Sequence, residues 1–167
     1  VNREENRRQD AEALQAAGIP VWVTYTRTVQ EALNLLWAIM DVFNETSMHM
    51  RVRVIEQAYD WVAGVSRARE GAPCRVFVPI WMQPLMTFNA DTYMHDLLQV
   101  CGGSNVFAEN DTRYPRIKMD DVAAAQPDVI LLPSEPFAFD ETHVATFAAL
   151  DIPAAHQGHI HLVDGSL

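Results

Sequence analysis

Two groups of side chains suited to noncovalent ligand binding follow two apolar segments of the sequence, at 75–80 and 129–132. The candidate ligand-binding residues in these two loops are Trp81, Met82, Pro84, Ser134 and Phe137. An indole and a phenyl ring offer large, flat, apolar faces that suit a macrocycle or an aromatic chelate. We therefore predict a binding surface built from both loops. The alternative is that Trp81 only closes the edge of a hydrophobic core.

The histidines do not form a convincing metal site. His159 and His161 would project from the same side of a strand, but their alternation with Ile160 and Leu162 is also what a half-exposed strand requires. No carboxylate or cysteine pattern accompanies them, so we predict no metal ligands.

Motifs for catalysis are equally weak. The chain contains no GxSxG, HExxH, P-loop or GxGxxG pattern, and Gly102-Gly103 follows a predicted helix instead of opening one. Ser134 and Glu135 are neighbours on a loop, where a nucleophile and its base seldom reach the required geometry. We predict that the protein is not an enzyme and needs no cofactor.

The two loops belong to a region in which strands and helices alternate. Strands are predicted at 75–80, 105–107, 129–132 and 160–163. Helices are predicted from Asp91 or Thr92 to Cys101, from 119 to 125, and from 140 to 150. This alternation predicts a doubly wound α/β lobe, in which loops at the carboxyl ends of the strands bind ligands.

The first 43 residues predict two helices and one strand. The first helix covers 4–17 and is stopped by Gly18, and a strand is expected over 19–25. Thr28 and Glu31 match a capping box that opens a second helix, to about Phe43. One strand is too little sheet for an independent lobe.

Between these regions, residues 45–70 predict a single long helix. Apolar residues recur at helical spacing, and at 1.5 Å per residue the helix would be roughly 39 Å long, more than a crossover needs. Its apolar face is expected to hold Met48, Val52, Ile55, Tyr59 and Val62. We predict a backbone helix over 44–72 that joins a partial N-terminal lobe at 1–43 to a C-terminal α/β lobe at 73–167.

Charge and cysteine content narrow the possible partners. The formal net charge of −10 repels phosphate backbones, so nucleic acid is not expected as a partner. Cys74 and Cys101 lack any CxxC context, and we favour two buried thiols over a disulfide. No apolar run reaches the length of a membrane span.

Several segments occur together in an order that resembles the helical-backbone (class III) periplasmic substrate-binding proteins of ABC transporters. This group includes receptors for cobalamin, ferric siderophores and haem. The matching segments are Glu4-Glu5-Asn6, Ala17-Gly18-Ile19-Pro20-Val21, Thr26-Arg27-Thr28, Leu97-Leu98, Cys101-Gly102-Gly103-Ser104-Asn105-Val106-Phe107, Pro127-Asp128-Val129-Ile130-Leu131-Leu132 and Val163-Asp164-Gly165.

The resemblance implies a receptor outside the cytoplasm, free or lipid-anchored as a lipoprotein, that delivers a metal chelate to an ABC permease. Asn2 resembles a residue at the rim of the first lobe. Acidic residues that would dock on the permease are Glu4, Glu5 and Asp10. Cobalamin is preferred over a ferric siderophore or haem because aromatic rings are expected in the cleft and no Arg or Tyr is expected in the C-terminal loops. The alternative is a doubly wound enzyme or nucleotide-binding domain that shares only the architecture.

Measured against that family, the sequence resembles a protein truncated in its N-terminal lobe. It begins with Val1 and leads directly into a helix. We expect that half of the ligand cleft is absent, that the fragment binds its chelate poorly, and that its exposed apolar surface favours self-association.

Overall fold

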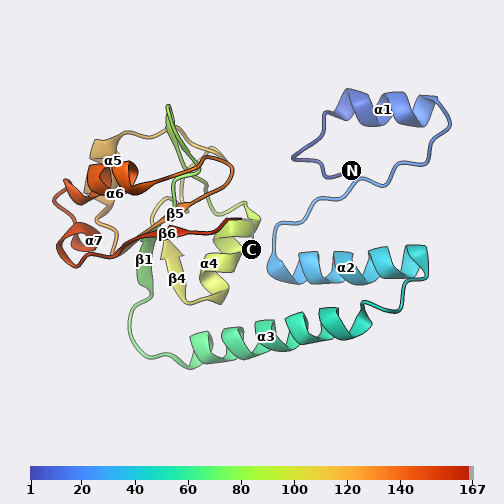
Figure 1. Ribbon diagram of the computed structural model, residues 1–167, viewed down its shortest axis with the longest axis horizontal. Helices are drawn as coiled ribbons and strands as arrows, with labels where there is room; N and C mark the ends of the chain where they lie inside the picture. The colour runs from blue at the N-terminus through green and yellow to red at the C-terminus, as the bar shows by residue number, and fades with distance from the viewer. Residues whose placement is uncertain (166–167) are drawn as a thin grey trace. The chain divides into compact units, whose positions relative to one another are not determined.

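The computed structural model describes residues 1–165 and divides into two compact units, Val1–Glu56 and Gln57–Leu167. The first elements are the helices α1 (Arg8–Ala16), α2 (Val29–Phe43) and α3 (His49–Ala68) (Figure 1). The elements that follow are β1 (Cys74–Phe77), β2 (Trp81–Met82), β3 (Leu85–Met86), α4 (Tyr93–Val100), β4 (Gly103–Asn105), α5 (Met119–Ala125), β5 (Val129–Pro133), α6 (Glu141–Ala148), α7 (Pro153–His156) and β6 (Ile160–Val163). None of the described helices combines the length and hydropathy needed to cross a bilayer.

The second unit is built on a parallel sheet with the strand order β4-β1-β5-β6. Val76 of β1 pairs with Asn105 of β4 on one side and with Val129 of β5 on the other. Because β4 and β5 lie on opposite sides of β1, the connections leaving β1 and β5 run in opposite directions. The carboxyl ends of β1 and β5 therefore form the switch point at which such sheets bind ligands.

Helices cover both faces of this sheet. Phe77, Ile130 and Leu132 point to one face, in a core shared with helices α5, α6 and α7. The helical members of that core are Val122, Phe147 and Ala154. Val76 and Val78 form a second core with Phe88, against which Leu98 of α4 packs. The prediction of a doubly wound α/β lobe is confirmed.

A small antiparallel sheet follows β1, where the sequence predicted only an irregular loop. Trp81 pairs with Met86, and Met82 with Leu85. Met86 also bridges to Arg116, flanked by a hydrogen bond from the Ile117 N–H to the Leu85 carbonyl. These strands are too short for their periodicity to show in the sequence.

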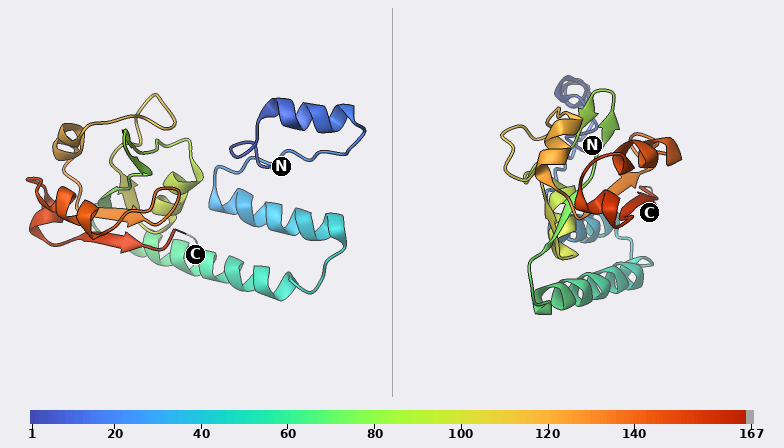
Figure 2. Two further views of the ribbon diagram at one scale, coloured as in Figure 1. Left: turned by 45° about the horizontal axis from the view of Figure 1, so that its top comes forward. Right: turned by 90° about the vertical axis from the view of Figure 1, so that its left-hand side faces the viewer.

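The first unit contains α1, α2 and the start of α3, and the Trp37 Nε1 of α2 donates to the Glu56 carboxylate in that start of α3 at 2.6 Å. Figure 2 shows the three helices again from two other directions. Thr28 caps α2 as predicted, its Oγ1 accepting from the Glu31 N–H at 3.1 Å. The Glu31 carboxylate reaches back to the Arg27 N–H at 2.7 Å. Asn44 ends α2 in the left-handed region, with φ 49°.

Three predictions for the first half of the chain are wrong in part. Helix α1 begins at Arg8 instead of residue 4, and 19–25 contains no strand, because among the described residues its only β-bridge joins Thr24 to Asn2. The long helix covers His49–Ala68, roughly 30 Å, because Asn44 turns the chain before it. Of its expected apolar face only Val52 is buried, and Ile55 is 49% exposed.

Differences in the second half are smaller. Strand β4 ends at Asn105, two residues before the predicted end, because the Asn105 Oδ1 accepts from the Phe107 N–H at 3.0 Å and turns the chain. Helix α7 was not predicted. Both cysteines are free thiols, but Cys74 is half-buried and Cys101 is exposed, so the prediction of two buried thiols is wrong.

Candidate ligand-binding site

The candidate site lies at what we call the carboxyl rim, which consists of the segments 78–92, 106–118 and 134–140. These segments follow the carboxyl ends of β1, β4 and β5 in the parallel sheet. The rim therefore includes the switch point between β1 and β5 as well as the small antiparallel sheet.

Two predicted site residues meet at the rim. The rings of Trp81 and Phe137 lie 5.4 Å apart at an interplanar angle of 65°, an edge-to-face contact. Trp81 is 41% exposed, and its Nε1 donates to the Gln83 carbonyl within its own hairpin at 3.0 Å. The indole is thus held in place with part of its surface open to a ligand.

Phe137 is supported from behind by the start of α6. Its ring contacts Phe139 at 4.8 Å and His143 at 5.4 Å. The His143 Nδ1 lies 2.7 Å from Oδ1 of Asp140, the N-cap of α6. Hydrogen bonds from the Thr142 hydroxyl and from His143 lower the pKa of Asp140 to about 2. Asp140 is therefore a carboxylate at neutral pH and fixes the base of the aromatic cluster.

The other predicted site residues of these loops lie near the Trp81–Phe137 pair in sequence, but they have other contacts. Met82 packs against the core, and Pro84 is exposed at the tip of the β2–β3 hairpin. The Ser134 Oγ accepts a hydrogen bond from the Gly165 N–H at 3.0 Å, and the Ser134 N–H donates to the Val163 carbonyl. Ser134 thus holds the segment after β6 against the end of β5.

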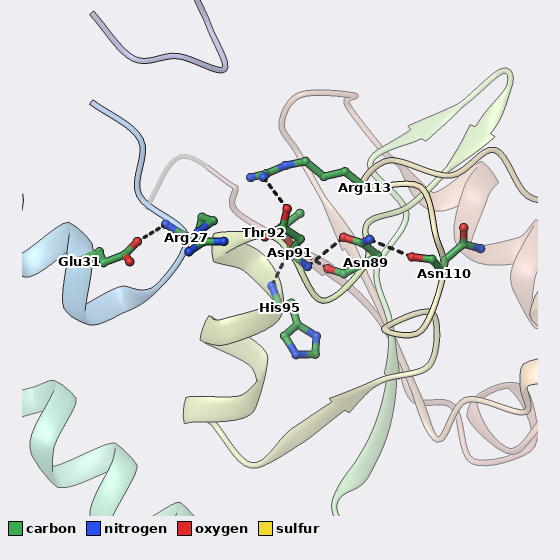
Figure 3. Close-up of polar contacts among 8 residues, drawn as sticks. All are labelled: Arg27, Glu31, Asn89, Asp91, Thr92, His95, Asn110 and Arg113. Carbon is green, nitrogen blue, oxygen red and sulfur yellow. Dashed lines mark hydrogen bonds and ion pairs between the residues drawn. The ribbon is translucent and has the colours of Figure 1, made fainter. Parts of the chain in front are cut away.

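Sequence reasoning missed the segment of the rim that follows β4. It carries Arg113, Tyr114 and Arg116, so the premise that the C-terminal loops offer no Arg or Tyr is wrong. Figure 3 shows Arg113 reaching Asp91, with Nη1 3.4 Å from Oδ2. The residues Arg113 to Arg116 lie between a strand predicted at 105–107 and a helix predicted at 119–125, and that position was the available signal.

The same close-up shows how this segment is fixed to the rim. The Asn89 Nδ2 donates to the Asn110 carbonyl at 2.8 Å (Figure 3), and the Asn89 N–H donates to the Arg113 carbonyl at 2.9 Å. Thr92 caps α4 by accepting from the His95 N–H. The segment 106–118 is therefore part of the same rigid edge as the hairpin.

In the first unit, Asn2 lines a cavity of about 410 Å³ together with Val1, Arg3, Arg7, Ala11 and Val23. The Asn2 Oδ1 accepts from the Glu4 N–H at 3.0 Å. Glu4 and Glu5 lie in a turn before α1, not in its first turn as expected, whereas Asp10 does lie there. All three acidic side chains are exposed.

The sequence and the structure of this chain were each compared with those of known proteins. No family model matches the chain. The vitamin B12-binding protein of Vibrio parahaemolyticus is 22% identical over 125 residues, which are 75% of this chain and 45% of that protein. The crystal structure of the periplasmic vitamin B12-binding protein of Vibrio cholerae aligns with a TM-score of 0.76 and 16% identity, over 98% of this chain and 63% of that one. The periplasmic haem-binding protein of Roseiflexus sp. RS-1 aligns with a TM-score of 0.74 and 16% identity, over 98% and 65%.

The chain has the class III periplasmic binding protein fold. The curated proteins with similar sequence are vitamin B12-binding proteins, and the solved structures that share the fold include a haem-binding protein and a substrate-binding protein of an ABC transporter from Listeria monocytogenes. The chain spans between 22% and 45% of the length of the curated relatives that it matches. Within this periplasmic binding protein fold, the carboxyl rim of the second unit is the edge that carries Trp81, Phe137 and the 106–118 segment.

Proposed function

We propose that this chain is part of an extracytoplasmic substrate-binding protein that captures a metal chelate for an ABC permease. The chelate classes are corrinoid, ferric siderophore and haem. The shared fold and the relatives that bind vitamin B12 or haem support the proposal. The backbone-helix division into 1–43, 44–72 and 73–167 belongs to the same proposal.

The observation that carries the proposal is the contact between Trp81 and Phe137. The two rings come from different loops, meet at the switch point and leave 41% of Trp81 exposed. Large planar rings with exposed faces bind flat apolar ligands by burial of area and by stacking. Such a surface changes no covalent bond in its ligand, which fits a receptor.

Titration of the protein with cyanocobalamin, haemin and a ferric siderophore, followed by tryptophan fluorescence, tests this function. We expect at least one chelate to quench the emission in a saturable manner. Trp81→Ala should weaken that binding by about tenfold, a loss of about 1.4 kcal/mol. Trp61→Ala is the matched control, because Trp61 is 70% exposed on α3, away from the rim. Equal effects of the two variants would contradict the assignment.

The permease contact is proposed for the acidic residues Glu4, Glu5 and Asp10. Complementary charge speeds encounter and fixes register, and its effect decreases with ionic strength. The triple variant to Gln, Gln and Asn should slow association with a permease whose docking surface is basic, with little change in dissociation. Glu12→Gln is the control, because Glu12 already pairs with Arg8 at 2.7 Å.

A further inference from the structure

We propose that Arg116 forms an anion-binding subsite beside Trp81, so that the rim selects a chelate carrying a negatively charged group. The inference rests on the proposed function and deepens it, because it chooses among the chelate classes. It also reverses the preference for cobalamin, since the premise for that preference was the absence of a cation from these loops.

The subsite follows from the pairing of two short strands and from one isolated β-bridge. Trp81 pairs with Met86, and Met86 bridges to Arg116 on its other side. Residues directly opposite each other in antiparallel strands project from the same face. Trp81, Met86 and Arg116 therefore form one row across the small sheet, while their neighbours Met82 and Leu85 face the core.

Distances across this row suit a single ligand. Neighbouring strands lie about 4.8 Å apart, so the Cα atoms of Trp81 and Arg116 are roughly 10 Å from each other. The bridge between Met86 and Arg116 is flanked by the bonds from Ile117 to Leu85 and from Thr87 to Pro115, the arrangement in which side chains approach most closely. A chelate stacked on the indole can place an anionic edge group at the guanidinium.

Arg116 differs from the other arginine of the segment. Arg113 is directed to Asp91, and its side chain is only 20% exposed. The Arg116 residue is exposed, and its backbone is fixed by the strand pairing around it. The guanidinium presents several donors in a planar fork that matches carboxylate and catecholate oxygens. Arg113 therefore positions the loop, and Arg116 is the group available to a ligand.

The acidic balance of this chain opposes anionic ligands, and Arg116 offsets it locally. With a formal net charge of −10, the protein repels anionic ligands at long range. A guanidinium acts within the Debye length of about 8 Å at physiological ionic strength, so Arg116 reaches the edge of a ligand that extends from Trp81 along the row. Glu109 and Asp111 lie in the same loop but precede the paired residues at 115–117.

NMR titration of the ¹⁵N-labelled chain tests the subsite, because it detects weak binding as well as tight binding. The reporter is the indole N–H signal of Trp81, identified by its loss in Trp81→Phe. The three diamagnetic probes are a gallium tris-catecholate siderophore complex, which is anionic, gallium ferrioxamine B, which is cationic, and cyanocobalamin, which is uncharged. The variants are Arg116→Gln and, as control, Lys118→Gln, which removes an exposed cation outside the row.

We expect the anionic probe to bind about tenfold more tightly than the other two, and Arg116→Gln to remove that advantage while Lys118→Gln retains it. Tighter binding of cyanocobalamin than of the anionic probe, or equal losses in the two variants, overturns the subsite but leaves the proposed function standing. If no probe moves the Trp81 signal at millimolar concentration, both proposals fail. Thermal unfolding of both variants verifies that they fold.

Discussion

Trp81 and Phe137 are in ring contact at 5.4 Å, although they lie on loops that follow two different strands of the parallel sheet. The contact exists because β1 and β5 are neighbours in register, with Phe77 paired to Ile130. Both strands end at the same edge of the sheet, and the loops that follow them bring their first aromatic side chains together. The cluster around this contact links the hairpin, the loop after β5 and the start of α6.

A double-mutant cycle on these two residues should reveal their coupling. We expect Trp81→Ala and Phe137→Ala together to cost less than the sum of the single variants by about 1 kcal/mol, the usual value of an edge-to-face pair. The measurement is urea unfolding of the four proteins. The pair Trp61→Ala and Phe137→Ala should show no coupling, and a coupling near zero for the first cycle would refute the contact.

Acid stability should depend on the Thr142 hydroxyl. The pKa of Asp140 is lowered to about 2, first by the hydrogen bond from Thr142 and then by those from His143. A depressed carboxylate contributes stability above its unfolded pKa of about 4, which is lost as the pH falls toward 2. Thr142→Val raises the folded pKa, so the acid-unfolding midpoint should move to higher pH.

The matched control for that variant is Thr146→Val on the same helix. The Thr146 hydroxyl donates to the Thr142 carbonyl at 2.8 Å. We expect circular dichroism across the acid range to give an unchanged midpoint for Thr146→Val. Equal shifts in the two variants would mean that helix α6, and not the Asp140 carboxylate, is responsible.

The two thiols should differ strongly in reactivity. Cys101 is exposed, whereas burial raises the pKa of the half-buried Cys74, which keeps less of it in the reactive thiolate form. Ellman's reagent at pH 8 should therefore modify the native protein in a fast and a slow phase. Cys101→Ser should remove the fast phase and Cys74→Ser the slow one. A single phase in the parent protein would contradict this assignment.

Self-association of the isolated chain is expected through apolar side chains of the first unit. Phe43 is 74% exposed and Met50 is 73% exposed. Nearby, Leu36, Ile39, Met40, Met48 and Val52 line a groove of about 380 Å³. Light scattering should show dimers or larger species, and the double variant Phe43→Ser and Met50→Ser should shift the population to monomer. Monomeric parent protein at high concentration would disprove the expectation.

The second unit was largely predictable because its signals are local and strong. The apolar run at 129–132 forms an inner strand of the parallel sheet, with Ile130 and Leu132 buried, and Thr92 and Asp140 cap their helices as expected. Helix α5 begins and ends at the predicted residues. These features depend on residues that are close together in the sequence and on the local spacing of apolar residues.

The missed features depend on partners that are distant in sequence. Residues 19–25 have the composition of a strand, but a strand exists only where a second strand pairs with it, and Thr24 pairs with Asn2 alone among the described residues. The row from Trp81 to Arg116 joins segments separated by a helix and a strand. No periodicity in the sequence places Arg116 beside Met86. The sequence therefore did not predict that the loop after β4 contributes to the site.

The hydrogen bond from the Trp81 indole to the Gln83 carbonyl limits how the site can choose between guests. With its single donor already occupied inside the hairpin, the indole offers a guest only its ring surface. In the proposed receptor, recognition at this point depends on the outline and flatness of the guest, so the indole itself does not separate chemically unrelated molecules of similar planarity. Under the proposed function, discrimination then arises at the periphery of the guest, and one unchanged aromatic contact serves several related cargoes.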